Sequence, residues 1–187
     1  MVLTYGIAES STARDEVQQF LSKNVGFDIA PNAIPRPEHD ATYAPLVAVA
    51  RDDEELVGAA LSCRAQVCVT AAMLRYRSPF GDYTVAKDRH SELDLMAVTP
   101  RVRSKGVGSE LIRLLERDLR SRGVRFWFGN MTDDSDLRAL IRFYERNGFT
   151  VLAKGEPIPS FMGLTWTLPN APVPERYFWK KLEGRAG

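Results

Sequence analysis

Hydrophobic and polar positions follow two different periods along this chain, and the two periods predict a mixture of strands and helices. Apolar positions at a helical spacing predict three helices, at residues 12–26, 106–123 and 135–148. Short β-rich runs predict strands, at residues 2–8, 46–52, 55–65, 91–100, 124–131, 149–154 and 175–182. Two of the helices follow candidate N-caps, which are Ser11 or Thr12 for the first helix and Asp133, Asp134 or Ser135 for the last.

The order of these elements predicts an α/β fold. Residues 91–154 run strand, helix, strand, helix, strand, which is typical of an α/β sandwich around a mixed sheet. Four acidic residues join the strands at 46–52 and 55–65, and the pair is predicted to be a hairpin. Four prolines make residues 30–45 a predicted loop. Residues 66–90 fit either an extension of the hairpin or a separate flap.

Composition narrows the class of protein. The chain has 187 residues, 44% of them hydrophobic and 26% charged, which predicts a single soluble globular domain over residues 1–187. A formal net charge of +1 argues against a nucleic-acid partner. No apolar run reaches the roughly 18 residues of a membrane span, and the N-terminal residues lack a signal-peptide pattern. Cys63 and Cys68 have no zinc-type partner pair and are predicted to be free thiols. We therefore expect a cytoplasmic protein without a bound metal.

A loop with two glycines stands between the strand at 91–100 and the helix that follows. The start of a helix carries unpaired N–H groups and a partial positive charge, which together bind anions. The sequence Arg103-Ser104-Lys105-Gly106-Val107-Gly108-Ser109 adds two basic side chains and two hydroxyls. It fits neither a Walker loop nor a Rossmann fingerprint, because the lysine precedes the glycine and position 111 is leucine. The loop predicts a site for a phosphate-bearing ligand; a helix start that binds nothing is the alternative.

The loop and a second motif resemble a known family. Arg103-x-x-Gly106-x-Gly108 is similar to the Arg/Gln-x-x-Gly-x-Gly/Ala signature of the GNAT superfamily of N-acetyltransferases. The surrounding LMAVTPRVRSKGVGSELI resembles their strand, proline turn, pyrophosphate loop and helix. Downstream, LIRFYERNGF resembles their second hallmark, a helix with a tyrosine just before an Asn/Gly-Phe turn. The resemblance spans residues 47–182 and is strongest over 91–149.

The resemblance implies a fold and a cofactor. The fold is of the GNAT acyl-CoA N-acyltransferase type, with a central mixed, twisted sheet of about six or seven strands that is splayed at the cofactor cleft and flanked by helices. Acetyl-CoA would lay its pantetheine arm along the backbone of Met96, Ala97 and Val98. Its pyrophosphate would rest on the loop, through Arg103, Ser104, Lys105, Gly106, Val107, Gly108 and Ser109. Many members carry a pantetheine-binding asparagine where this chain reads DDSDLRAL, and Asn130 is the substitute candidate.

Two catalytic residues follow from the resemblance. Tyr144 aligns with the family tyrosine that faces the CoA sulfur and serves as general acid, although packing in the core is the alternative. Glu92 falls where histone-type members carry their general base, and its side chain shares one strand face with Asp94, Met96 and Val98. A solvated carboxylate is the alternative for Glu92, with Asp94, His90 or a water chain in reserve as base.

The implied reaction is direct transfer of an acetyl group from acetyl-CoA to a primary amine of an unidentified acceptor. The N–H of Val98 would polarise the thioester carbonyl, and the thiolate would leave toward Tyr144. No Cys/His pair supports a covalent cysteine route. Two other readings stay open: an acetyltransferase that acts on protein or tRNA, and a non-catalytic acyl-CoA-binding module. Near-zero net charge argues against tRNA, and the presence of both Tyr144 and Glu92 argues against a pure binder.

A small-molecule or peptide amine is the expected acceptor, and a homodimer is left open because dimers are common in the superfamily. The resemblance assigns acceptor choice to the segments before Pro45, at 66–90 and at 155–174. Arg75 and Arg77 in the second segment favour an acidic acceptor. Aromatic side chains there either line an acceptor pocket, form a dimer seam or fill a local core: Tyr76, Phe80, Tyr83, Phe161 and Trp166.

Overall fold

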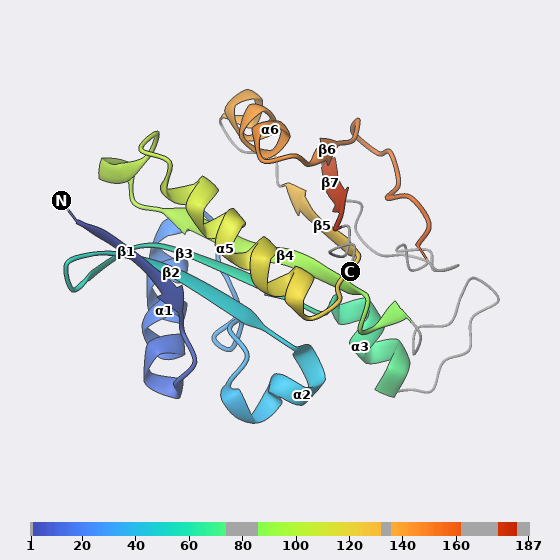
Figure 1. The fold of residues 1–187 in the computed structure, drawn as a ribbon, viewed down its shortest axis with the longest axis horizontal. Helices are drawn as coiled ribbons and strands as arrows, with labels where there is room; N and C mark the ends of the chain where they lie inside the picture. The colour runs from blue at the N-terminus through green and yellow to red at the C-terminus, as the bar shows by residue number, and fades with distance from the viewer. Residues whose placement is uncertain (1, 74–85, 132–135, 162–175, 183–187) are drawn as a thin grey trace. The chain divides into compact units, whose positions relative to one another are not determined.

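The computed structural model describes residues 2–73, 86–131, 136–161 and 176–182 (Figure 1). The chain divides into two compact units, of which the first consists of Met1–Cys63 and Leu93–Ser121. The second consists of Arg64–Glu92 and Arg122–Gly187. The boundary between Glu92 and Leu93 falls within one strand. The organisation of residues 1–187 as one domain stays a prediction.

In the described part of the chain, seven strands pair in the order β1-β2-β3-β4-β5-β7-β6. The strands are β1 Leu3–Ile7, β2 Leu46–Asp52, β3 Glu55–Cys63, β4 His90–Val98, β5 Phe126–Met131, β6 Thr150–Val151 and β7 Arg176–Lys181. The helices are α1 Ser11–Asn24, α2 Asp40–Tyr43, α3 Gln66–Met73, α5 Val107–Ser121 and α6 Leu137–Arg146, with 3-10 turns η1 Pro37–His39 and η2 Pro100–Val102. The α/β class and the predicted hairpin are confirmed, whereas the splay of the sheet stays a prediction. None of the described helices has the length and apolar character needed to cross a bilayer.

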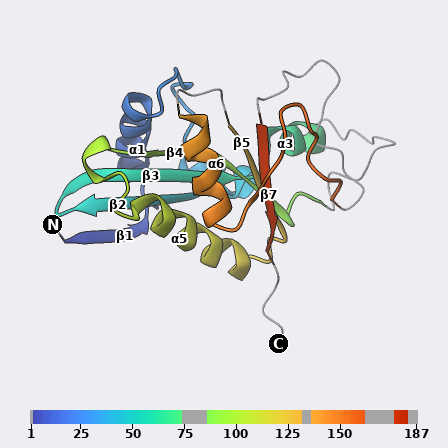
Figure 2. The ribbon, with the colours of Figure 1, turned by 90° about the horizontal axis from the view of Figure 1, so that it is seen from above.

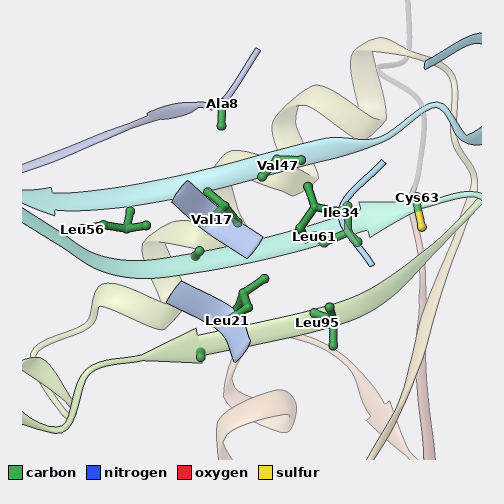
Figure 3. Close-up of a cluster of buried hydrophobic side chains, with 11 residues drawn as sticks. Ala8, Val17, Leu21, Ile34, Val47, Leu56, Leu61, Cys63 and Leu95 are labelled. Atoms are coloured by element: carbon green, nitrogen blue, oxygen red, sulfur yellow. The ribbon is translucent and has the colours of Figure 1, made fainter. Parts of the chain in front are cut away.

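Helix α1 covers one face of the sheet in the first unit. Val17 and Leu21 of α1 pack against Val47, Leu61 and Leu95, which come from three neighbouring strands (Figure 3). All five side chains are buried, and complete burial of such a side chain contributes about 1.5–3 kcal/mol. This core therefore fixes the C-terminal half of β4 against β2 and β3.

The cap of α1 lies one residue before the predicted positions. Ser10 has an extended backbone, with φ −79° and ψ 155°, and its hydroxyl accepts a hydrogen bond from the N–H of Ala13 at 3.2 Å. Because this geometry makes Ser10 the N-cap, the prediction of Ser11 or Thr12 is wrong. The helix ends before Gly26, whose φ is 82°, as the sequence predicts.

A buried arginine organises the loop that follows α1. Arg14 is 5% exposed, and its guanidinium donates to the carbonyls of Ala8 at 3.1 Å and Pro35 at 2.9 Å. It also forms a bidentate ion pair with Asp40, in which Nη1 lies 2.5 Å from Oδ1 and Nη2 lies 2.9 Å from Oδ2. The charge of Arg14 is therefore compensated inside the protein. The predicted loop at 30–45 is correct apart from the helical turns η1 and α2, which Asp40 joins.

Helix α5 covers the opposite face of the same strands (Figure 2). The strand positions beneath it are small, and a Cβ added at Gly58 would lie only 3.1 Å from Cγ1 of Val107 and 3.2 Å from Cδ1 of Leu111. Gly58 therefore lets the first turn of α5 lie close to the sheet. The helical spacing of apolar positions predicts that Val107, Leu111, Leu114, Leu115 and Leu119 share one face of this helix. All of these are buried except Leu114, which is half-buried, and Ile112 is buried as well.

The second unit is built on β5 and β7, which pair antiparallel with Phe128 opposite Trp179 and Asn130 opposite Tyr177. Phe126, Phe128, Tyr177 and Trp179 face a buried cluster that includes Cys68 of α3. The alternate positions face α6, where Trp127 packs on Phe149 and Phe178 packs on Tyr144. The two faces of this ladder therefore carry two separate aromatic layers.

Three predictions for the second unit need correction. Gln66–Met73 forms helix α3, which excludes an extension of the hairpin through these residues, because Ala65, Cys68 and Val69 are buried at helical spacing and packing overrides the strand preference of valine and threonine. The N-cap of α6 is Asp136, whose carboxylate accepts from Ala139 at 3.2 Å. The predicted caps are wrong and lie outside the described residues: Asp133, Asp134 and Ser135. Strand β6 is shorter than the predicted 149–154.

Candidate active site

Two residues with left-handed backbone shape the loop between β4 and α5. Ser104 has φ 61° and Gly106 has φ 85°. At Gly106 a side chain would be strained by this backbone, yet no heavy atom lies within 4 Å of the position where a Cβ would stand. Backbone conformation rather than crowding therefore requires glycine here. The open space beside it agrees with the predicted close approach of a ligand.

The loop leads directly into the first turn of α5. The carbonyl of Gly106 accepts a hydrogen bond from the N–H of Glu110 at 3.0 Å. The N–H groups of Val107, Gly108 and Ser109 come before the first intrahelical bond and lie at the positive end of the helix dipole. The preceding residues, Arg103 to Lys105, are exposed. This arrangement of backbone donors and basic side chains can bind an anion.

Two arginines connect the loop to the sheet. Arg101 pairs with Asp52 at 3.0 Å and with Glu55 at 2.6 Å, both at the turn between β2 and β3. Nε of Arg103 donates to the carbonyl of Val98, the last residue of β4, at 3.1 Å. Arg101 thus supports the turn, and Arg103 and Lys105 remain the basic side chains of the predicted pyrophosphate loop.

The alternation predicted for β4 is confirmed. Leu95 and Ala97 are buried on one face. Met96 and Val98 are half-buried on the other face, and Asp94 on that face is exposed. Protein atoms around the Asp94 carboxyl raise its pKa by desolvation, even though the side chain keeps contact with solvent. Met96, Ala97 and Val98 thus lie in the first unit, on the strand that leads into the loop.

Tyr144 is buried on α6 in the second unit, with 7% of its surface exposed. Its ring stacks on Phe178 at a centroid distance of 3.8 Å and meets Phe149 edge-on at 5.8 Å. Burial raises the pKa of the phenol, so that it keeps its proton at neutral pH. Within the described part of the chain, no group hydrogen-bonds to its hydroxyl. The ring of Tyr144 thus packs in the core, as the alternative interpretation expects, while its hydroxyl stays available as a donor.

Glu92 lies beside Asn130 in the second unit. Nδ2 of Asn130 donates to Oε1 of Glu92 at 3.4 Å, across the start of β4 and the end of β5. Tyr177 stands opposite Asn130 on β7, and burial and the charge of Glu92 together raise its pKa. The carboxylate also acts on Cys68, whose pKa is raised to about 12 by burial and secondly by Glu92. These contacts place Glu92 on the α3 side of the ladder, opposite the side that holds Tyr144.

The reserve base His90 is fully engaged. It is 2% exposed, its Nε2 accepts from the N–H of Ala65 at 3.0 Å, and its Nδ1 lies 2.9 Å from the carbonyl of Ala86. These partners define a neutral imidazole with its proton on Nδ1. Burial lowers the pKa of His90 to about 4. With both nitrogens bound to the backbone, His90 is a structural residue. Both cysteines are buried and neither forms a disulfide, and the raised pKa of Cys68 keeps it a neutral thiol.

The predicted site residues therefore fall into three groups. Met96–Val98 and Arg103–Ser109 are consecutive parts of the first unit. Glu92 and Asn130 are brought together in the second unit, and Tyr144 lies on the other face of the β5–β7 ladder. The acceptor residues Arg75, Tyr76, Arg77, Phe80, Tyr83 and Trp166 lie outside the described residues. Phe161 stacks on Phe126 at 5.0 Å and is part of a local core.

Known proteins share this fold. The model of the acetyltransferase (GNAT) family matches residues 14–149. A GNAT-family acetyltransferase of Staphylococcus aureus Mu50 is 16% identical, with a TM-score of 0.61 over 96% of this chain and 100% of that one. The ribosomal-protein-S18-alanine N-acetyltransferase of Escherichia coli is 15% identical, with a TM-score of 0.58 over 100% of this chain and 97% of that one. A Bacillus subtilis acetyltransferase in complex with CoA is 15% identical, with a TM-score of 0.56 over 97% and 100%. No curated protein sequence matches the chain.

The α/β sheet flanked by helices and the match to the family model together identify the class of protein as an acetyltransferase. The chain belongs to the acetyltransferase (GNAT) family. At these identities the solved structures show the fold, which is the predicted mixed sheet flanked by helices.

Sequence reasoning does not single out Tyr177, which lies beside Glu92 and Asn130. The residue belongs to the predicted last strand, and no motif marks it. Only the register of β7 against β5 places it opposite Asn130, beside the carboxylate of Glu92. The alternation of side chains along a strand places Tyr177 and Trp179 of ERYFWKKL on one face. It does not show which neighbouring strand lies beside them.

Proposed function

We propose that this chain transfers an acetyl group from acetyl-CoA to a primary amine. One observation carries the proposal within the family: the loop of Arg103–Ser109 turns through two left-handed residues into the positive end of α5. Such a turn presents backbone N–H groups to a pyrophosphate, with Arg103 and Lys105 adding charge. The backbone of Met96, Ala97 and Val98 would hold the pantetheine arm, as the resemblance implies.

The chemistry is a direct displacement. Glu92 takes one proton from the acceptor ammonium, and the nitrogen lone pair of the resulting amine forms a bond to the thioester carbon. The N–H of Val98 stabilises the charge that develops on the carbonyl oxygen. The C–S bond then breaks, and the sulfur receives a proton from the hydroxyl of Tyr144. The amide nitrogen loses its second proton to solvent, which leaves an acetylated amine and CoA.

The properties of Tyr144 support its part in this scheme. An acid that protonates a thiolate must hold its proton at neutral pH, and burial gives Tyr144 a raised pKa. Its ring is fixed by Phe178 and Phe149, so that the hydroxyl has a defined direction. Glu92 is half-buried and receives a hydrogen bond from Asn130, which favours an ordered carboxylate. A cytoplasmic location and a small-molecule or peptide acceptor belong to the same proposal.

Thermal unfolding tests the cofactor part first. A ligand that binds only the folded protein raises its stability by RT ln(1 + [L]/Kd), which is about 2.7 kcal/mol when the concentration is 100 times Kd. We expect a rise in melting temperature with acetyl-CoA and none with ATP. Thiol release over a panel of small amines and short peptides then tests transfer. No stabilisation by any CoA species at millimolar concentration would overturn the proposal.

A further inference from the structure

Three neighbouring strands, β4, β5 and β7, carry a row of polar side chains that belong to the second unit. Glu92 lies near the start of β4, Asn130 near the end of β5, and Tyr177 opposite Asn130 on β7. The amide of Asn130 reaches Glu92 at 3.4 Å, and the charge of Glu92 acts on the phenol of Tyr177. Three residues far apart in sequence therefore share one local environment, on the α3 side of the β5–β7 ladder.

This polar row replaces an aromatic layer. Along β5 the same face carries Phe126 and Phe128, and along β7 it carries Trp179 opposite Phe128. Two residues further along each strand, the facing pair on this side is Asn130 and Tyr177. Asn130 is exposed, and Glu92 and Tyr177 are half-buried. A ligand can reach this face at the position where the buried aromatic side chains end and these more accessible polar groups begin.

The chemistry of the row selects a cation with several N–H donors. A carboxylate only accepts hydrogen bonds, so the amide nitrogen of Asn130 must face Glu92 and its carbonyl oxygen faces away. The row thus offers a carboxylate, an amide oxygen and a phenol oxygen, all of which can accept. An alkylammonium has one positive charge and three N–H donors. The number of acceptor groups matches the number of N–H donors, and the charges are of opposite sign.

We propose that Glu92, Asn130 and Tyr177 form a seat for the protonated acceptor amine, with Tyr177 as a residue that determines its affinity. The inference rests on the proposed function in taking Glu92 as the group that receives the proton. The amine would be bound as an ammonium, with N–H groups directed to Asn130 and Tyr177 while the third faces the carboxylate. The predicted contact between Asn130 and CoA is the competing role for that residue, and the two roles give opposite results with a simple amine.

A titration with a simple ammonium tests the seat without acetyl-CoA. The probe is n-butylammonium chloride, followed by the side-chain amide signal of Asn130 in nitrogen-15 NMR spectra and assigned by its loss in Asn130→Asp. Potassium chloride at equal ionic strength and n-butanol are the controls for charge alone and for the apolar chain alone. We expect a saturable shift with n-butylammonium only. Equal shifts with potassium chloride or n-butanol, or no shift at all, would overturn the seat.

Tyr177→Phe isolates the hydroxyl, because the ring that packs against the aromatic cluster is kept. Losing one hydrogen bond weakens n-butylammonium binding about three- to tenfold, and Glu92→Gln removes the charge and abolishes saturation. Tyr5→Phe, at an exposed tyrosine of the first unit, is the matched control and keeps the wild-type affinity. An unchanged affinity in Tyr177→Phe would remove Tyr177 from the seat and overturn the inference.

Kinetics separate this inference from the proposed function. With n-butylamine as acceptor and thiol release as readout, Tyr177→Phe raises the KM for the amine about three- to tenfold while the KM for acetyl-CoA stays constant. Saturable binding of n-butylammonium by a protein that no CoA species stabilises would refute the function and leave the seat. Transfer with the same amine KM in Tyr177→Phe and wild type would refute the seat and leave the function.

Discussion

The two units hold their functional groups in different ways. In the first unit the predicted cofactor residues are consecutive in sequence, and the groups that matter are backbone N–H groups oriented by the left-handed turn at Gly106 and by the start of α5. In the second unit Glu92, Asn130, Tyr177 and Tyr144 come from four elements, and the groups that matter are side chains held by packing. The comparison teaches that the predicted cofactor residues of the first unit depend on local conformation, whereas the proposed catalytic residues of the second depend on tertiary structure.

The largest effect that this comparison predicts belongs to a single hydroxyl of the second unit. In Tyr144→Phe the ring still stacks on Phe178, so folding is preserved while the proton donor is lost. We expect kcat to fall about 100-fold or more, with the stabilisation by acetyl-CoA unchanged. The measurement is steady-state thiol release together with thermal unfolding. A variant with normal kcat would make Tyr144 a core residue only.

Acid should lower the stability of the second unit by protonating His90. The folded-state pKa of about 4 lies below the usual 6.5, because burial disfavours the charged form. The unfolded chain therefore binds the proton more readily, and the stability from the neutral form is complete above about pH 6.5. It is lost as pH falls toward 4, by up to about 3 kcal/mol. The tryptophans Trp127, Trp166 and Trp179 all belong to the second unit, so their fluorescence during urea unfolding follows this loss.

His90→Gln is the variant that checks this origin. It cannot titrate, so its stability should be lower at pH 7.5 but should change less between pH 7 and pH 4.5 than that of the wild type. His39→Gln, at the other histidine, which is exposed, should keep the wild-type pH dependence. If His90→Gln retained the full acid sensitivity, buried carboxyl groups rather than His90 would be its source.

A matched pair of glycines tests the first unit. Gly106 has φ 85° and Gly155 has φ 76°, and at both positions a Cβ would meet no atom within 4 Å. Alanine at either position therefore introduces a similar backbone strain, about 1–2 kcal/mol. Only Gly106→Ala should weaken acetyl-CoA binding, by about tenfold, because relaxation of the loop misdirects its N–H donors. Calorimetric titration with acetyl-CoA measures both. Equal affinities in the two variants would separate the loop from cofactor binding.

The same contrast explains what could be read from the sequence. The loop at 103–109 was predictable because its chemistry needs only neighbouring residues, and Tyr144 because a motif surrounds it. The sequence left residues 66–90 open between a hairpin extension and a flap, because the valines and threonine of α3 favour a strand, and only burial against Phe126 and Phe128 decides for a helix. The charged pair of Arg14 and Asp40 was missed because an arginine on a helix usually faces solvent, whereas this one is buried by the returning loop. Tyr177 needed the register of two strands.

The smallest predicted effect concerns the support of α6. Nζ of Lys180 donates to the carbonyl of Asn147 at the end of this helix at 2.9 Å, and lies 4.7 Å from the ring centroid of Phe149 and 5.5 Å from that of Trp127. A cation at a helix C-terminus and over aromatic rings contributes about 1 kcal/mol. Lys180→Gln should therefore lower the melting temperature by about 2–4 °C, while Lys181→Gln, at the exposed neighbouring position, should change it little.

The effect of Lys180→Gln on activity shows how closely catalysis in the second unit depends on packing. Phe149 contacts both Lys180 and Tyr144, so loosening the end of α6 reaches the proposed acid through a single aromatic ring. We expect kcat to fall only about two- to threefold, since the stack of Tyr144 on Phe178 is independent of the lysine. A loss of activity as large as that of Tyr144→Phe would mean that α6 is positioned mainly by its C-terminal cap. Unchanged activity with the lower melting temperature would show that the aromatic stack alone holds Tyr144 in place.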